Sequence, residues 1–228
     1  MWPQASAWAT EAAAVFAKDW RSELRTRYAL NTLALFAFTT LVVVSVSLGP
    51  LGVSESQGTA VLPVLLWLIL LFAAAAGLPR SFVHEEETQT AIALRLAATP
   101  SALFCGKLAY CLTLVIALEA LITPVFLAMM NLSVGAPLLL VLVLAAGGYG
   151  LAAGSTLVAA IIAQARGKGT LFSVLAFPVL LPLLLLAVEL TRQAIGGDPA
   201  GVALTQLILY DATITVAALM LFPAVWNP

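Results

Sequence analysis

The side chains that could carry chemistry are concentrated in one stretch of this sequence, residues 79–107. It contains His84, the carboxylate triplet Glu85–Glu87 and the basic residues Arg80, Arg95 and Lys107, between two long apolar runs. A carboxylate triplet offers hydrogen-bond acceptors to Arg or Lys of another protein. The alternative is a solvated loop that its charge keeps out of the bilayer. In either case this stretch cannot lie in hydrocarbon, so it must face water or a partner.

Motifs for nucleotide binding and catalysis are missing from the sequence. A phosphate-binding loop requires G-x-x-x-x-G-K-[ST], whose amides hold the phosphates while Lys and the hydroxyl reach phosphate and magnesium. Gly106-Lys107 and Gly167-Lys168 both lack the upstream glycine and the following hydroxyl residue. There is also no H-E-x-x-H, G-x-S-x-G or clustered Cys/His motif. We therefore expect no catalytic residue and no metal site here, and any ATP hydrolysis in a separate subunit.

Composition indicates a membrane protein. Of the 228 residues, 62% are hydrophobic and 9% are charged, and the mean hydropathy is +1.07. A soluble domain has about 25% charged residues, so this chain could not keep a wetted surface. Its net charge of −1 and the lack of a basic stripe with interleaved aromatics argue against nucleic acid as a partner. We expect a polytopic protein in contact with membrane lipid.

Six apolar runs are long enough to cross a bilayer of about 30 Å. They cover about 29–48, 60–78, 106–130, 137–163, 170–188 and 204–226. The sequence therefore predicts an all-α membrane protein with six transmembrane helices, forming a single domain over residues 29–228. Residues 79–107 are the longest connection between two spans.

Residues 1–28 have a different pattern. Trp8, Ala12, Phe16, Trp20 and Leu24 recur at helical spacing, and the basic residues occupy other faces. Tryptophan beside basic residues is typical of the bilayer boundary. We therefore predict an amphipathic helix over residues 1–28 that lies flat on the membrane surface. The alternative is a soluble helix packed on a partner.

The long connection is expected to contain a helix of its own. No Gly or Pro interrupts residues 81–98, which favours a helix there. Pro100 is predicted to end that helix, and Ser101 to cap the next one. A short amphipathic helix between two spans suits a surface that transmits force to or from a partner.

The basic residues predict the orientation. Nine of the ten Lys and Arg precede the first span or lie between spans two and three or four and five, which share one side when the number of spans is even. Only Arg192 falls on the opposite side. The positive-inside rule therefore predicts that both termini and residues 79–107 are cytoplasmic.

Four residues inside the predicted spans are further candidates. Glu119 and Asp211 are ionisable at a depth where charge is costly, so they are expected to face a cavity or a partner group. They would serve either as a polar lining of a subunit interface or substrate path, or as interhelical hydrogen-bonding groups. Gly150 and Gly154 have the GxxxG spacing that permits close helix packing, within the chain or with another subunit.

The loop pattern resembles that of membrane subunits of ABC-2-type exporters. The matching positions are Phe82, Glu85–Glu87, Thr88/Thr90, Leu94, Pro100 and Gly106-Lys107. Within that group the chain most resembles the cytochrome c maturation protein B family, also called haem exporter protein B. The stretches that carry the likeness are LPVLLWLILLFAAAAGLPRSFVHEEETQT, LRLAATPSALFCGK and FPVLLPLLLLAVEL. One departure is Gln89, where such sequences usually have glycine.

The resemblance implies a permease subunit in a bacterial cytoplasmic (inner) membrane, paired with a cytoplasmic ATP-binding subunit that holds the ATP. In that family the complex works with other cytochrome c maturation membrane proteins and a periplasmic haem chaperone, and ATP use is tied to release of the loaded chaperone. Haem is thus implied for the wider complex, and pairing with a second permease subunit for the assembly. Carried onto this sequence, the residues that couple to the ATP-binding subunit are Glu85, Glu86, Glu87, Thr90 and Arg95.

Two other functions remain as alternatives. One is an ABC-2-type exporter of a lipid, drug or polysaccharide, which a dependence of c-type cytochromes on this chain would exclude. The other is a membrane scaffold or secondary transporter, which binding of an ATP-binding subunit would exclude. His84 is of a residue type that often ligates haem, but it lies amid acidic charge and we interpret it as an ordinary loop histidine.

Overall fold

Seven long helices make up the part of the chain that the structure describes. The computed structural model describes residues 3–48, 55–78, 85, 90, 94, 96–163 and 171–226. The helices are α1 (Pro3–Thr26), α2 (Tyr28–Leu48), α3 (Glu55–Gly77), α6 (Pro100–Met129), α7 (Pro137–Ala163), α8 (Leu171–Gly196) and α9 (Ala203–Trp226). Within these ranges there is no strand, so the predicted all-α class is confirmed.

Six of these helices, all except α1, are long and apolar enough to cross a membrane. The six predicted spans are thereby confirmed, with three helix boundaries displaced. Helix α3 begins at Glu55 rather than near residue 60. Helix α6 begins at Pro100, about one and a half turns before the apolar run, with Thr99 as its N-cap. The prediction that Ser101 caps this helix was therefore wrong, because proline fits the first helical position, where its missing N–H costs nothing. Helix α8 continues beyond the apolar run to Gly196, and in this extension Glu189 and Arg192 form an i,i+3 ion pair (2.6 Å) on its exposed side.

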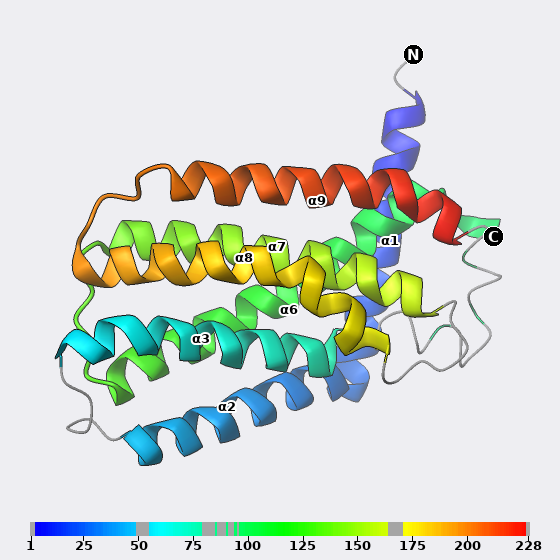
Figure 1. The fold of residues 1–228 in the computed structure, drawn as a ribbon. Helices are drawn as coiled ribbons and strands as arrows, with labels where there is room; N and C mark the ends of the chain where they lie inside the picture. Colours follow the sequence, from blue (N-terminus) through cyan, green and yellow to red (C-terminus); the bar gives the residue numbers. More distant parts are fainter. Residues whose placement is uncertain are drawn as a thin grey trace.

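The six apolar helices run side by side, and α1 crosses one end of the bundle (Figure 1). Both termini lie at that end, as an even number of spans requires (Figure 1). Between α1 and α2 a single residue, Arg27, adopts a left-handed conformation with φ of 51°. That residue turns the chain from the crosswise helix directly into the first apolar helix.

Helix α7 lies among α3, α6, α8 and α9. Its glycines allow this crowding: a Cβ on Gly147 would overlap the ring of Trp67 on α3. The Trp67 indole is fully buried, and its Nε1 donates a hydrogen bond of 2.8 Å to Oγ1 of Thr191 on α8. The Trp67–Thr191 hydrogen bond thus joins α3 to α8, and Gly147 of α7 leaves room for the indole ring. The bond satisfies the indole N–H, which burial would otherwise leave unpaired.

Candidate functional site

The crosswise helix α1 lies directly on the first turns of α6, and Gly106 makes this contact possible. A Cβ on Gly106 would stand 2.6 Å from the carbonyl oxygen of Ala12 and 2.8 Å from Cβ of Val15. Real Cβ atoms do not approach backbone this closely, so any larger residue would push the two helices apart. The next residue of α6, Lys107, is thereby held against α1.

Lys107 is fully buried, and its ammonium group joins three parts of the chain. Its Nζ lies 3.2 Å from Oδ2 of Asp19 on α1 and 2.9 Å from Oε1 of Glu85 in the connection between α3 and α6. Lys18 is half exposed and donates to the same Glu85 oxygen, and its Nζ lies 3.0 Å from Oδ1 of Asp19. A buried charge is tolerated only when it is paired, and here two ammonium groups meet two carboxylates. We call Lys18, Asp19, Glu85 and Lys107 the Lys107 cluster.

The electrostatics around Lys18 favour its charged form. Partial burial alone would lower the pKa of Lys18, but the carboxylates of Asp19 and Glu85 outweigh it and raise that pKa above its usual value. Lys18 therefore stays protonated at neutral pH, as the ion pairs require.

A second set of contacts fixes the N-terminal half of α1 to the start of α6. The Glu11 carboxylate accepts two hydrogen bonds of 2.9 Å, from the backbone N–H and the hydroxyl of Thr99. These bonds hold the pKa of Glu11 below its usual value. The indole of Trp8 donates to Oγ of Ser101 at 3.0 Å. The N-terminal residues of α6 are thus bound by α1 rather than by side-chain caps of their own.

Glu23, in the last turns of α1, connects three helices. Its Oε2 accepts a hydrogen bond from the Tyr110 hydroxyl of α6 at 3.1 Å, and its Oε1 accepts one from the backbone N–H of Leu30 at 2.8 Å. Leu30 lies in the first turn of α2, where backbone N–H groups have no partner inside the helix. Glu23 therefore caps α2 while it binds α6.

The five residues predicted to couple to a partner fall into two groups. Glu85 and Thr90 are described, and Glu86, Glu87 and Arg95 lie outside the described residues, as does His84. Glu85 is buried with 4% of its surface exposed, and the chain's own lysines engage it. Thr90 is exposed, and its N–H donates to the carbonyl of Glu85 at 3.0 Å. Sequence reasoning missed the buried pairing of Glu85, although the Gly106-Lys107 motif was a signal for it.

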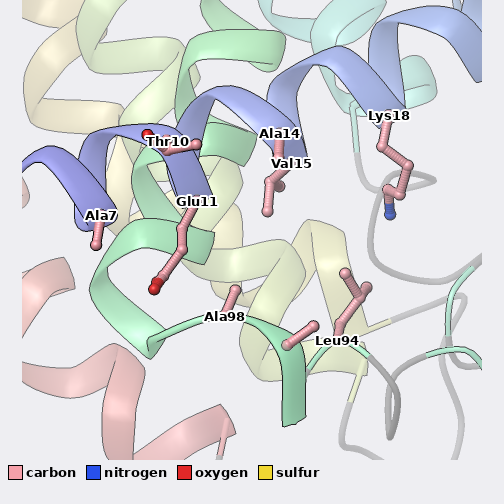
Figure 2. A pocket seen from close by; sticks show the side chains of 9 residues that line it. Ala7, Thr10, Glu11, Ala14, Val15, Lys18, Leu94 and Ala98 are labelled. Carbon is pink, nitrogen blue, oxygen red and sulfur yellow. The ribbon is translucent and has the colours of Figure 1, made fainter.

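A cavity of about 620 Å³ lies between α1 and the side chains of Leu94, Ala97 and Ala98. Figure 2 shows side chains that line it. Its walls are mostly small and apolar, with Glu11 and Lys18 among the lining residues. The lining residues are Ala7, Thr10, Glu11, Ala14, Val15, Lys18, Leu94, Ala97 and Ala98. The cavity therefore adjoins the Lys107 cluster through Lys18.

Within the spans, the two predicted carboxylates lie against glycines of α7. A Cβ on Gly148 would stand 2.6 Å from Oε1 of Glu119, and one on Gly150 would overlap Oδ1 of Asp211. Both carboxyl groups are buried, and these two oxygens have no hydrogen-bond partner in the part of the chain that the structure describes. Glu119 reaches α7 from α6, and Asp211 reaches it from α9.

The predicted GxxxG pair faces α8 from the same stretch of α7. A Cβ on Gly150 would overlap the side chain of Leu183, and one on Gly154 would lie 2.6 Å from Cδ2 of Leu180. The bare backbone of α7 thus lets α8 approach closely within one chain.

Comparison with known proteins assigns the chain to a family. A family model described as CcmB protein matches residues 10–226, which include all six apolar helices and most of α1. A search of curated proteins gave no significant match. The match agrees with the resemblance inferred from the loop and span motifs. Membership of this family implies a role in cytochrome c biogenesis and haem transport. The chain therefore belongs to the CcmB family, as a multi-pass membrane subunit of the haem exporter of cytochrome c maturation.

Proposed function

We propose that this chain converts ATP hydrolysis in a separate cytoplasmic subunit into a rearrangement of its spans. The rearrangement would serve haem delivery, or release of the haem-loaded periplasmic chaperone. The observation that supports the proposal is that buried Lys107 binds Asp19 and Glu85 together. The chain has no nucleotide-binding motif, so its role in the complex is mechanical rather than catalytic.

The position of Lys107 explains how motion would be transmitted. A displacement of the connection at Glu85 would act on α6 through Lys107 and on α1 through Asp19. Helix α6 is 30 residues long and packs on α7, α2 and α9. Since a helix moves as a rigid element, a displacement of its first turns would reach the opposite side of the membrane.

The partner surface would include the cavity beside α1 and residues Glu86, Glu87 and Arg95 of the same connection. The orientation from the positive-inside rule puts this end of the bundle in the cytoplasm of a bacterial inner membrane. Two copies of the chain with two ATP-binding subunits would make the assembly, together with other cytochrome c maturation membrane proteins. Replacing both Glu86 and Glu87 by Lys should release the ATP-binding subunit during co-purification. Unchanged co-purification would remove these carboxylates from the partner surface.

The function is tested by staining covalent haem in c-type cytochromes of cells that lack the gene. A plasmid copy of the wild-type chain should restore the stain, and Lys107→Met should not, at equal membrane levels. Lys18→Met is the matched control, because Lys18 is half exposed and Lys107 keeps its own bonds to Asp19 and Glu85. Normal cytochromes in the deletion strain would contradict the proposed function.

A further inference from the structure

Three arginines stand exposed where α1 meets α2. Arg21, Arg25 and Arg27 lie within seven residues of one another, at the end of α1 and in the turn that follows it. None of the three forms an ion pair with any residue that the structure describes. Within the described part of the chain, no carboxylate therefore pairs with these three positive charges.

The acidic residues of α1 do not pair with these arginines, because each of the three is bound by other groups. Glu11 is bound by Thr99. Asp19 is bound by the two lysines of the Lys107 cluster. Glu23 accepts from Tyr110 and Leu30. Helix α1 thus turns its carboxylates towards α6 and α2 and leaves its arginines on the outside.

The location of the arginines is at the boundary of a membrane span. Helix α2, which is apolar enough to cross a bilayer, begins at Tyr28, immediately after Arg27. Leu24, between Arg21 and Arg25, has 51% of its surface exposed, and Tyr28 has 45%. Basic groups interleaved with apolar ones are typical of the headgroup level of a bilayer.

We propose that Arg21, Arg25 and Arg27 form a binding site for the phosphate groups of anionic phospholipids. A guanidinium group binds a phosphate through two parallel hydrogen bonds, and Leu24 would lie at the edge of the acyl region. An acidic protein surface would also satisfy the charges, but it would not account for an exposed leucine and tyrosine beside the first residue of a span. The site would anchor α1 in the headgroup layer while the Lys107 cluster anchors it to α6.

The proposal is tested with the purified full chain in bilayers of phosphatidylcholine, by electron paramagnetic resonance of spin-labelled lipids. Spin-labelled phosphatidylglycerol should associate more strongly than spin-labelled phosphatidylcholine at low salt, and the preference should weaken as salt is raised. Each arginine replaced by Gln should lower the relative association of phosphatidylglycerol by about five-fold. The triple replacement should abolish the preference.

Two control variants make the result specific. R192Q removes a basic residue from the opposite end of the bundle, where it is paired with Glu189, and should leave the preference intact. Replacing all three arginines by Lys keeps the charge and should retain most of the preference. If the triple Gln variant keeps the preference, the lipid site is elsewhere. If the wild-type chain shows no preference and the triple Gln variant instead fails to retain the ATP-binding subunit, the arginines serve a protein partner; both results overturn the proposal.

Discussion

The ammonium group of Lys107 lies 2.9 Å from Oε1 of Glu85, so the start of α6 is bound to the connection that precedes it. Asp19 of α1, 88 residues away in sequence, binds the same ammonium group at 3.2 Å. One buried cation therefore holds together the crosswise helix, a span and the connection between two spans. The stability and the coupling of this end of the bundle should both depend on it.

Lys107→Met should lower the free energy of unfolding by about 3–5 kcal/mol, because it removes the cation from two buried carboxylates while it keeps the volume. Lys18→Met should cost about 1 kcal/mol or less, since Lys18 is half exposed. Denaturant titration in one detergent compares the two variants. An equal decrease in the free energy of unfolding for both variants would contradict this prediction, because the buried and the exposed lysine would then contribute equally to stability.

Gly106→Ala should separate α1 from α6. The new methyl group would meet the backbone carbonyl of Ala12, at an overpacking cost of about 1–3 kcal/mol that exceeds a helix-propensity gain of about 1 kcal/mol. Gly154→Ala is the matched control, because its methyl group would meet only the flexible end of Leu180. Protease cleavage within α1 should accelerate in the first variant and not in the second. Faster cleavage in the Gly154→Ala chain than in the Gly106→Ala chain would contradict the close contact between Gly106 and Ala12.

Thr191→Val should destabilise the centre of the bundle by about 1–3 kcal/mol, because it leaves the buried indole N–H of Trp67 without its acceptor. The Thr191 hydroxyl also donates to the carbonyl oxygen of Ala187, four residues earlier. Thr213 donates to the carbonyl oxygen of Leu209 in the same way, but it is exposed on α9. Thr213→Val should therefore be close to neutral. Thermal unfolding followed by tryptophan fluorescence measures both, and a neutral Thr191→Val would mean that Trp67 finds another acceptor.

Glu119→Leu should separate stability from function. Glu119 is buried, and its Oε1 has no partner among the described residues, so an apolar replacement should raise the free energy of unfolding by about 1–3 kcal/mol. If Glu119 lines a substrate path or a subunit interface, the same variant should fail to support formation of c-type cytochromes. Exposed Glu189, replaced by Gln, serves as the control. Full activity of Glu119→Leu would exclude a functional role for this carboxyl group.

The sequence predicted the spans well because burial in a bilayer imposes long apolar runs. It placed the start of α6 too late, at residue 106, since the polar Ser101 precedes the apolar run, although Trp8 of α1 binds its hydroxyl group. It also ended α8 too early, at the polar residues Glu189 and Arg192 that pair with each other along the helix. In both places a polar side chain has a hydrogen-bonding or ionic partner within the protein, which the hydropathy of neighbouring residues cannot reveal.

The Lys107 cluster could not be predicted in the same way. Only Lys18 and Asp19 are neighbours in the sequence, and the other contacts join residues that are 22, 67 and 88 positions apart. A lysine near the end of an apolar run is usually expected to reach the water phase, so the Gly106-Lys107 pair by itself did not predict that Lys107 is buried. Glu85 was identified as a candidate, but as an acceptor for a partner rather than for this chain's own lysines.

The most direct test of the coupling role is the ATPase rate of the co-purified complex in lipid nanodiscs, with wild-type chain, Lys107→Met or Lys18→Met. Lys107 is fully buried, so Lys107→Met should still retain the ATP-binding subunit while losing most of the stimulation of its ATPase. Lys18→Met should keep the larger part of that stimulation. Full stimulation by a correctly folded Lys107→Met chain would contradict the proposal that Lys107 transmits motion between the connection and α6.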